Sequence, residues 1–107
     1  MVVEIDKNDP EQLAAYFNSE TAKISWSELE RFYAQGVVLH VKHPLDLVDV
    51  AVKLAQDDAA TFSNWIEKNQ VGRMADDVAA ELFASQEDVW AVVAAPWVLV
   101  QLVASDL

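Results

Sequence analysis

The most constraining feature of this chain is a stretch without any charged side chain, which runs from residue 89 to residue 105. It is nearly all apolar, rich in β-branched Val, and divided by Pro96. Valine favours strands, whereas proline cannot continue a central strand ladder. A membrane-spanning helix needs about 20 apolar residues. The stretch therefore predicts buried strands at 90–93 and 97–103, either consecutive or one strand kinked at Pro96, and no membrane anchor.

Helix-start signals dominate the first part of the chain. Asp9 followed by Pro10 predicts a helix that fades near Ser19, because Asp caps helices and Pro fits the first helical position. Ser25 and Glu28 have the spacing of a capping box, which predicts a second helix that ends at Gly36.

The middle of the chain alternates between the two kinds of structure. Residues 37–42 predict a strand, 46–56 a helix, and 57–69 a further helix capped by Asp57-Asp58. Residues 70–74 predict a short connector or a brief strand, and a helix capped by Asp76 follows.

These elements predict a single α+β domain over residues 1–107, with residues 1–8 as the candidate for a disordered start. The expected order is α-α-β-α-α-α-β-β. So few strands predict a small sheet of two to four strands packed against helices.

Composition excludes several classes of function. The chain has 18 acidic and 7 basic side chains and a net charge of −11, which disfavours nucleic acid and anionic membranes as partners. It has no cysteine, and its first nine residues lack the apolar core of a secretory signal, so we expect a cytoplasmic protein. With two glycines and no phosphate-binding loop, no cofactor is expected.

One constellation resembles a metal site. His40 and His43, followed by Asp46 and Asp49, offer ligand types that suit zinc or another non-haem metal. Their spacing crosses from a strand through a loop to a helix start, so no regular geometry brings them together. The alternative is a purely structural role for each residue: His40 lies on a sheet face, His43 lies in a turn, and Asp46 caps a helix.

Adjacent carboxylates occur at Asp57-Asp58, Asp76-Asp77 and Glu87-Asp88. Neighbouring residues on a helix point about 100° apart, so such pairs rarely share one proton. We interpret them as caps and not as an acid–base pair.

The tryptophans suggest an interaction surface. Trp90 and Trp97 bracket Pro96, and tryptophan is enriched at interface hot spots. These three residues are the candidates for a partner-binding surface. A long uncharged strand also favours such a surface, because an exposed apolar strand attracts a partner that covers it.

Three segments resemble a known family. They are Glu20 to Phe32 (ETAKISWSELERF), Gly36 to Val38, and Trp90 to Gln101 with its APWVLVQ string. The sequence of these segments is similar to that of an uncharacterised domain of unknown function found mainly in proteobacteria and cyanobacteria. The resemblance implies a stand-alone cytosolic bacterial protein and transfers no site residue.

The sequence therefore favours a non-enzymatic module that binds another protein or itself, with a homodimer as the specific expectation. Two alternatives remain. One is a metal-dependent enzyme or accessory protein that uses His40 and His43. The other is an acidic regulator that occupies a basic partner.

Overall fold

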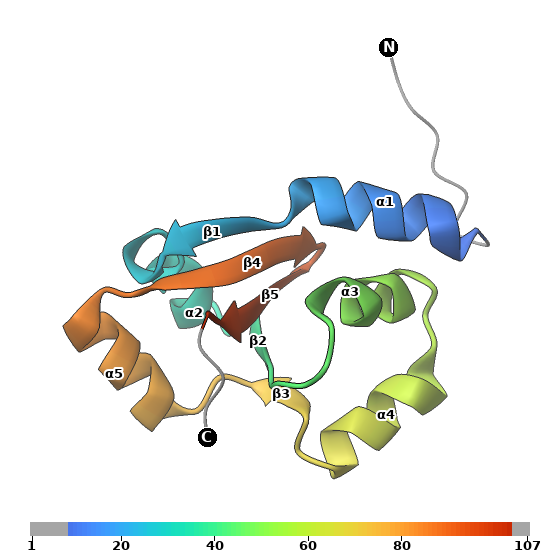
Figure 1. The fold of residues 1–107 in the computed structure, drawn as a ribbon. Helices are drawn as coiled ribbons and strands as arrows, with labels where there is room; N and C mark the ends of the chain where they lie inside the picture. Colours follow the sequence, from blue (N-terminus) through green and yellow to red (C-terminus); the bar gives the residue numbers. More distant parts are fainter. Residues whose placement is uncertain (1–8, 104–107) are drawn as a thin grey trace.

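The computed structural model describes residues 9–103, which form five α-helices, one short 3-10 helix (η1) and a five-stranded sheet (Figure 1). In chain order the elements are α1 (Pro10–Glu20), β1 (Ala22–Ser25), η1 (Trp26–Glu28), α2 (Glu30–Ala34), β2 (Val38–Val41), α3 (Leu47–Ala55), α4 (Ala59–Glu67), β3 (Val71–Arg73), α5 (Asp76–Ser85), β4 (Asp88–Ala94) and β5 (Trp97–Leu102). The α+β class is thus confirmed.

The strands lie in the order β1-β4-β5-β2-β3. β2 and β5 are parallel and the other neighbouring pairs are antiparallel, so the sheet is mixed. β4 and β5 form a hairpin that runs from the pair Val89–Leu102 to the pair Ala94–Trp97, and Pro96 lies in its turn. The sequence left two arrangements open for the uncharged stretch, and the structure contains the first of them, two consecutive strands.

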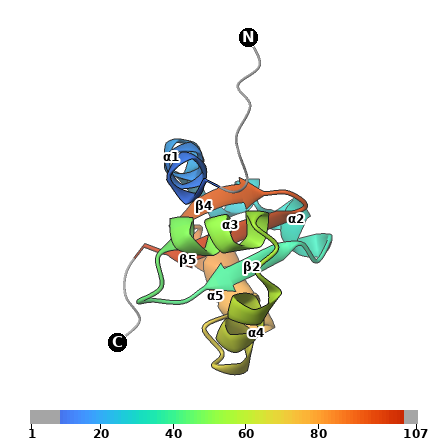
Figure 2. The ribbon, with the colours of Figure 1, turned by 90° about the vertical axis from the view of Figure 1, so that its right-hand side faces the viewer.

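Both faces of this sheet are covered, because successive side chains of a strand point to opposite faces. In β5, Leu99 packs into a core with α1 and α3, while Val98 and Val100 pack into a second core with η1 and α5. α1 and α3 lie side by side in both views (Figures 1 and 2), and α5 lies at the opposite side of Figure 1. The central strands are therefore buried on two sides, which explains their continuous run of valines.

Three of the predicted helix caps are present. Oδ1 of Asp9 accepts a hydrogen bond from the Glu11 N–H at 3.0 Å. Oδ1 of Asp46 accepts from the Val48 N–H at 3.0 Å, and Oδ1 of Asp58 accepts from the Thr61 N–H at 3.1 Å. Each carboxylate satisfies an otherwise unpaired donor of the first helical turn.

The predicted capping box does not form. Ser25 ends β1 instead and makes no side-chain cap, and its Oγ lies 2.8 Å from the Oγ of Ser27. The chain then turns through η1, which buries Trp26 at 1% exposure, and α2 begins only at Glu30. Pairing of β1 with β4 overrides the local helix signal, because the strand partner satisfies several backbone groups along one side of β1 where a cap satisfies one donor.

The predicted order and strand count are also wrong. The sheet has five strands and not two to four, because Ala22–Ser25 forms a strand that the sequence reading missed and Val71–Arg73 adds the brief strand at the other edge. The predicted cap Asp76 is the first residue of α5, and Ala75 holds the cap position without a side-chain bond. The predicted disordered start, residues 1–8, lies outside the described residues.

Within residues 9–103, no helix combines the length and apolar content that a bilayer crossing requires.

Candidate functional site

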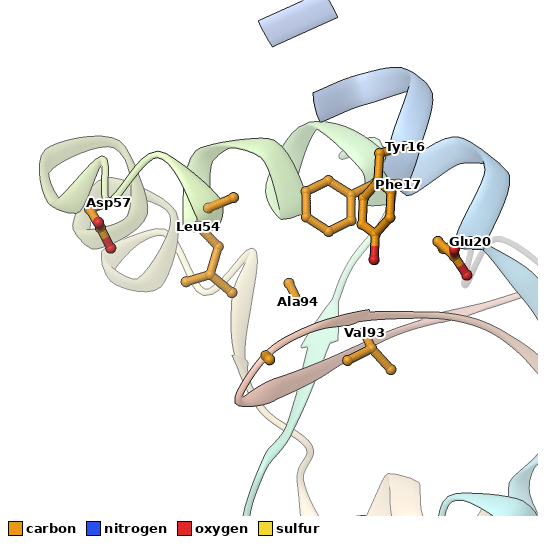
Figure 3. A pocket seen from close by; sticks show the side chains of 9 residues that line it. Tyr16, Phe17, Glu20, Leu54, Asp57, Val93 and Ala94 are labelled. Carbon is orange, nitrogen blue, oxygen red and sulfur yellow. The ribbon is translucent and has the colours of Figure 1, made fainter. Parts of the chain in front are cut away.

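A groove of about 390 Å³ opens where α1, α3 and the β4–β5 hairpin meet (Figure 3). Its walls come from three distant parts of the sequence: the C-terminal part of α1, the end of α3 with Asp57 in the turn after it, and the end of β4 with Ala95 in the hairpin turn. The residues that line it are Tyr16, Phe17, Glu20, Leu54, Ala55, Asp57, Val93, Ala94 and Ala95. Its volume falls within the roughly 300–1,000 Å³ of typical ligand sites.

Two exposed hydrophobic side chains distinguish this groove. Among the described residues, six large hydrophobic side chains are exposed, and Tyr16 (41%) and Val93 (58%) both line the groove. Phe17 is buried in the core behind them, and its ring lies 5.2 Å from that of Tyr16 in an edge-to-face arrangement. Leaving two such side chains in water on either side of one hollow is unfavourable, so the groove is a candidate contact surface.

The exposure of Tyr16 and Val93 follows from their position in each element. Leu13 and Phe17 point from α1 into the core, and Tyr16, about 100° round the helix from Phe17, falls at the edge of that apolar face. β1 pairs with β4 only as far as Ala91, so Val93 lies on the part of β4 that extends past β1.

Carboxylates mark the two ends of the groove. Figure 3 shows Glu20 at one end and Asp57 at the other, with Leu54, Phe17 and Ala94 between them. None of the nine lining residues is basic. The groove therefore combines an apolar floor with negative charge at each end.

Two helix C-termini add to this negative potential. Glu20 is the last residue of α1, and Ala55 is the last residue of α3. The C-terminal end of a helix carries about half a negative charge. The last turn of α1 holds no basic side chain, and Lys53 in the last turn of α3 is paired with Asp58, with its Nζ 3.9 Å from Oδ2.

Asp57 reaches the groove because of an unusual backbone conformation. Its φ of 57° is left-handed, and its N–H donates a hydrogen bond to the Leu54 carbonyl at 3.2 Å. Asp is one of the few residues other than glycine that enter this region readily. The tight turn separates α3 from α4 and leaves the carboxylate exposed at the groove.

The structure does not bring the candidate metal ligands of the sequence together as one site. His40 lies within β2 at 9% exposure, while the exposed His43 has its Nε2 2.8 Å from the Leu102 carbonyl oxygen. Asp46 caps α3, and Asp49 is exposed in its first turn. Residues 9–103 contain no group of three His, Cys, Asp or Glu side chains that could hold a metal ion.

The predicted partner-binding residues lie at two ends of the hairpin. Trp90 is 37% exposed, pairs with Gln101, and has the Lys23 ammonium 5.4 Å from its ring centroid. Trp97 pairs with Ala94 at the other end and is half-buried against the core on the α1–α3 face. Pro96 is exposed in the turn, directly after the groove residue Ala95. A binding role for these three residues remains a prediction.

The sequence reading did not single out the groove residues Tyr16, Glu20, Asp57 and Val93 as a site. Tyr16 fell within the first predicted helix, Asp57 in a predicted cap and Val93 in a predicted buried strand. Local patterns carry no signal that segments near residues 16, 57 and 93 converge, so only the tertiary structure reveals this site.

Comparison with known proteins gives a family and a fold. The family model described as "Protein of unknown function (DUF2288)" matches residues 12–102, which include the segment 20–101 that carries the resemblance noted above. The NMR solution structure of PA1075 from Pseudomonas aeruginosa is similar, with a TM-score of 0.77 and 36% sequence identity. That similarity covers 97% of this chain and 95% of the Pseudomonas chain. No curated protein matches.

Proposed function

We propose that the chain, which belongs to the DUF2288 family of proteins of unknown function, is a non-catalytic protein-binding module. Its binding surface in this proposal is the groove between α1, α3 and the β4–β5 hairpin. One observation carries the proposal: Tyr16 and Val93, both exposed, flank the same hollow.

The energetics of this surface favour a protein ligand. An apolar side chain that enters the groove covers Tyr16, Val93 and part of Leu54, and burial of apolar area contributes about 25 cal/mol per Å². Tyrosine is among the residues most enriched at interface hot spots. The groove offers no histidine, serine or lysine for nucleophilic or acid–base chemistry, and its two carboxylates stand at opposite ends.

The charges favour a different protein over a second copy as the partner. Two copies that met groove to groove would bring Glu20 and Asp57 of each chain against those of the other, and like charges oppose association. A homodimer remains a proposal for the surface near Trp90, Pro96 and Trp97. The absence of cysteine supports the further proposal of a cytoplasmic location.

Paired surface variants test the function. Val93→Lys places a long cationic side chain at the groove, whereas Ile66→Lys changes another β-branched residue of similar exposure (52% against 58%) on α4, away from the groove. Both side chains are largely in solvent, so both variants are expected to keep the fold. Wild type and variants are immobilised and exposed to lysate of the source organism, and bound proteins are quantified by mass spectrometry.

A partner retained by wild type and Ile66→Lys but lost with Val93→Lys supports the groove as the binding surface. Identical sets of bound proteins on all three would contradict it. Sedimentation equilibrium of the wild type at high concentration tests the homodimer separately.

A further inference from the structure

We infer that the groove binds a basic segment of a protein, in which two arginine or lysine side chains flank a short apolar stretch. The inference rests on the proposed function and adds the chemistry of the partner. It follows from the negative charge at the two ends of the groove and from the apolar side chains that lie between those ends.

Negative charge at the groove comes from two independent sources. Glu20 and Asp57 contribute exposed carboxylates, and the C-terminal ends of α1 and α3, one at each end of the groove, contribute the negative ends of their helix dipoles. The groove lining includes no basic residue, so Glu20 and the C-terminal end of α1 have no basic partner there. Asp57 lies beside the N-terminus of α4 and shares a neighbouring hollow with Lys53, whose Nζ is 3.9 Å from Oδ2 of Asp58, but the lining itself remains negative. A cation is therefore the complementary group.

The spacing of these charges selects an extended segment over a single ion. Glu20 and Asp57 stand at opposite ends of the groove, and apolar side chains fill the interval between them (Figure 3). One cation cannot satisfy both ends and would leave the apolar floor in water. A basic-apolar-basic segment places a charge at each carboxylate and an apolar side chain on Leu54 and Ala94.

Tyr16 suits the same ligand. Tyr16 is 41% exposed and lines the groove, and a guanidinium that approaches Glu20 can stack on the face of an aromatic ring. This arrangement favours arginine over lysine at the Glu20 end, because the planar guanidinium can stack and pair with a carboxylate at once.

Other acidic hollows of the described chain are less suited to a cation. The hollow between α2 and α5 is lined by Trp26, Phe83 and the carboxylates of Glu30 and Asp76. Asp76 already accepts a hydrogen bond from the Tyr33 hydroxyl, and Glu30 accepts one from the Gln86 side-chain amide at 3.4 Å. The aromatic ring of Trp90 is likewise already approached by Lys23.

The test is a titration of the ¹⁵N-labelled full chain followed by NMR. The probe is the acetylated, amidated peptide Arg-Leu-Ala-Leu-Arg, and its control replaces both arginines by citrulline, which is nearly isosteric and neutral. We expect the arginine peptide to shift the amides of Tyr16–Glu20, Leu54–Asp57 and Val93–Ala95. The citrulline peptide should bind about tenfold more weakly, and the affinity of the arginine peptide should fall as salt rises.

Single-residue variants locate the charge recognition. Glu20→Gln and Asp57→Asn should each weaken the arginine peptide about two- to fivefold, as expected for one exposed ion pair. Glu67→Gln removes an exposed carboxylate outside the groove and should leave the affinity unchanged.

Equal affinities of the two peptides at the groove would overturn the inference and leave the proposed function standing. Arginine-dependent shifts that fall elsewhere, or no shifts at all, would also overturn it. The capture experiment with Val93→Lys is read separately from this result, because it detects any protein that the groove retains, whatever the charge of that protein.

Discussion

The hydroxyl of Tyr33 in α2 donates a hydrogen bond to Oδ1 of Asp76, the first residue of α5. This bond joins two helices on the same face of the sheet. It also raises the pKa of Tyr33 above its ordinary value of 10.0, mainly because the neutral phenol is the donor, with smaller contributions from desolvation and the nearby carboxylate charge.

Tyr33→Phe tests this link through its pH dependence. The folded chain holds the Tyr33 proton more tightly than the unfolded chain, so the stabilisation is complete below about pH 10 and is lost as the pH rises through the folded pKa. In urea denaturation, we expect wild type to exceed Tyr33→Phe in free energy of unfolding at about pH 8, and the difference to shrink by about pH 11. Tyr16→Phe, which removes a hydroxyl outside this pair, is the control. A difference that stays constant up to about pH 11 would contradict the prediction.

Asp58→Asn tests the cap of α4 at the acid end of the pH range. The pKa of Asp58 is lowered, first by the hydrogen bond from the Thr61 N–H, then by the Thr61 hydroxyl and, more weakly, by the charge of Lys53. The stabilisation is therefore present above the ordinary value of 3.8 and disappears as the pH falls through the folded pKa.

We expect Asp58→Asn to lower the thermal midpoint at about pH 7 and to match wild type near about pH 2, because both side chains are then neutral. Glu67→Gln, at the other end of the same helix, should have little effect at either pH. An equal loss at both values would show that the charge of Asp58 is not what stabilises the cap.

Gly36→Ala and Gly72→Ala form a contrasting pair. Gly36 has a φ of +76°, where an alanine Cβ is strained, so we expect the free energy of unfolding to fall by about 1 kcal/mol. At Gly72 a Cβ would meet no heavy atom within 4 Å, and the backbone is that of a strand, so no loss is expected. Urea denaturation of both variants measures the contrast. Equal losses would show that the left-handed conformation of Gly36 does not account for the cost of its substitution.

Leu99→Ala tests the two-sided burial of the central sheet. Leu99 is 0% exposed and lies in β5 beneath α1 and α3, so its truncation should cost about 2–5 kcal/mol through lost burial and a residual cavity. Val93→Ala, at 58% exposure in the neighbouring strand, should change the free energy of unfolding by no more than about 0.5 kcal/mol. A similar cost for both variants would show that the sheet is not packed as described.

Family and fold class were within reach of the sequence. The segments around residues 20–32 and 90–101 carried the family resemblance, which the match over residues 12–102 confirms. Pro96 between two valine-rich runs predicted two strands, which pair as the β4–β5 hairpin. These signals are local, because caps, prolines and apolar periodicity act within a few residues.

The tertiary structure alone decided β1 and the groove. Ala22–Ser25 is an edge strand only because β4 lies beside it, and this pairing displaces the helix that Ser25 and Glu28 predicted. Tyr16, Asp57 and Val93 meet only because the packing of α1 and α3 on the sheet brings their ends to the hairpin. Short-range physics thus fixes where elements start and stop, whereas contacts between residues far apart in the chain determine which strand gains a partner and which side chains share a surface.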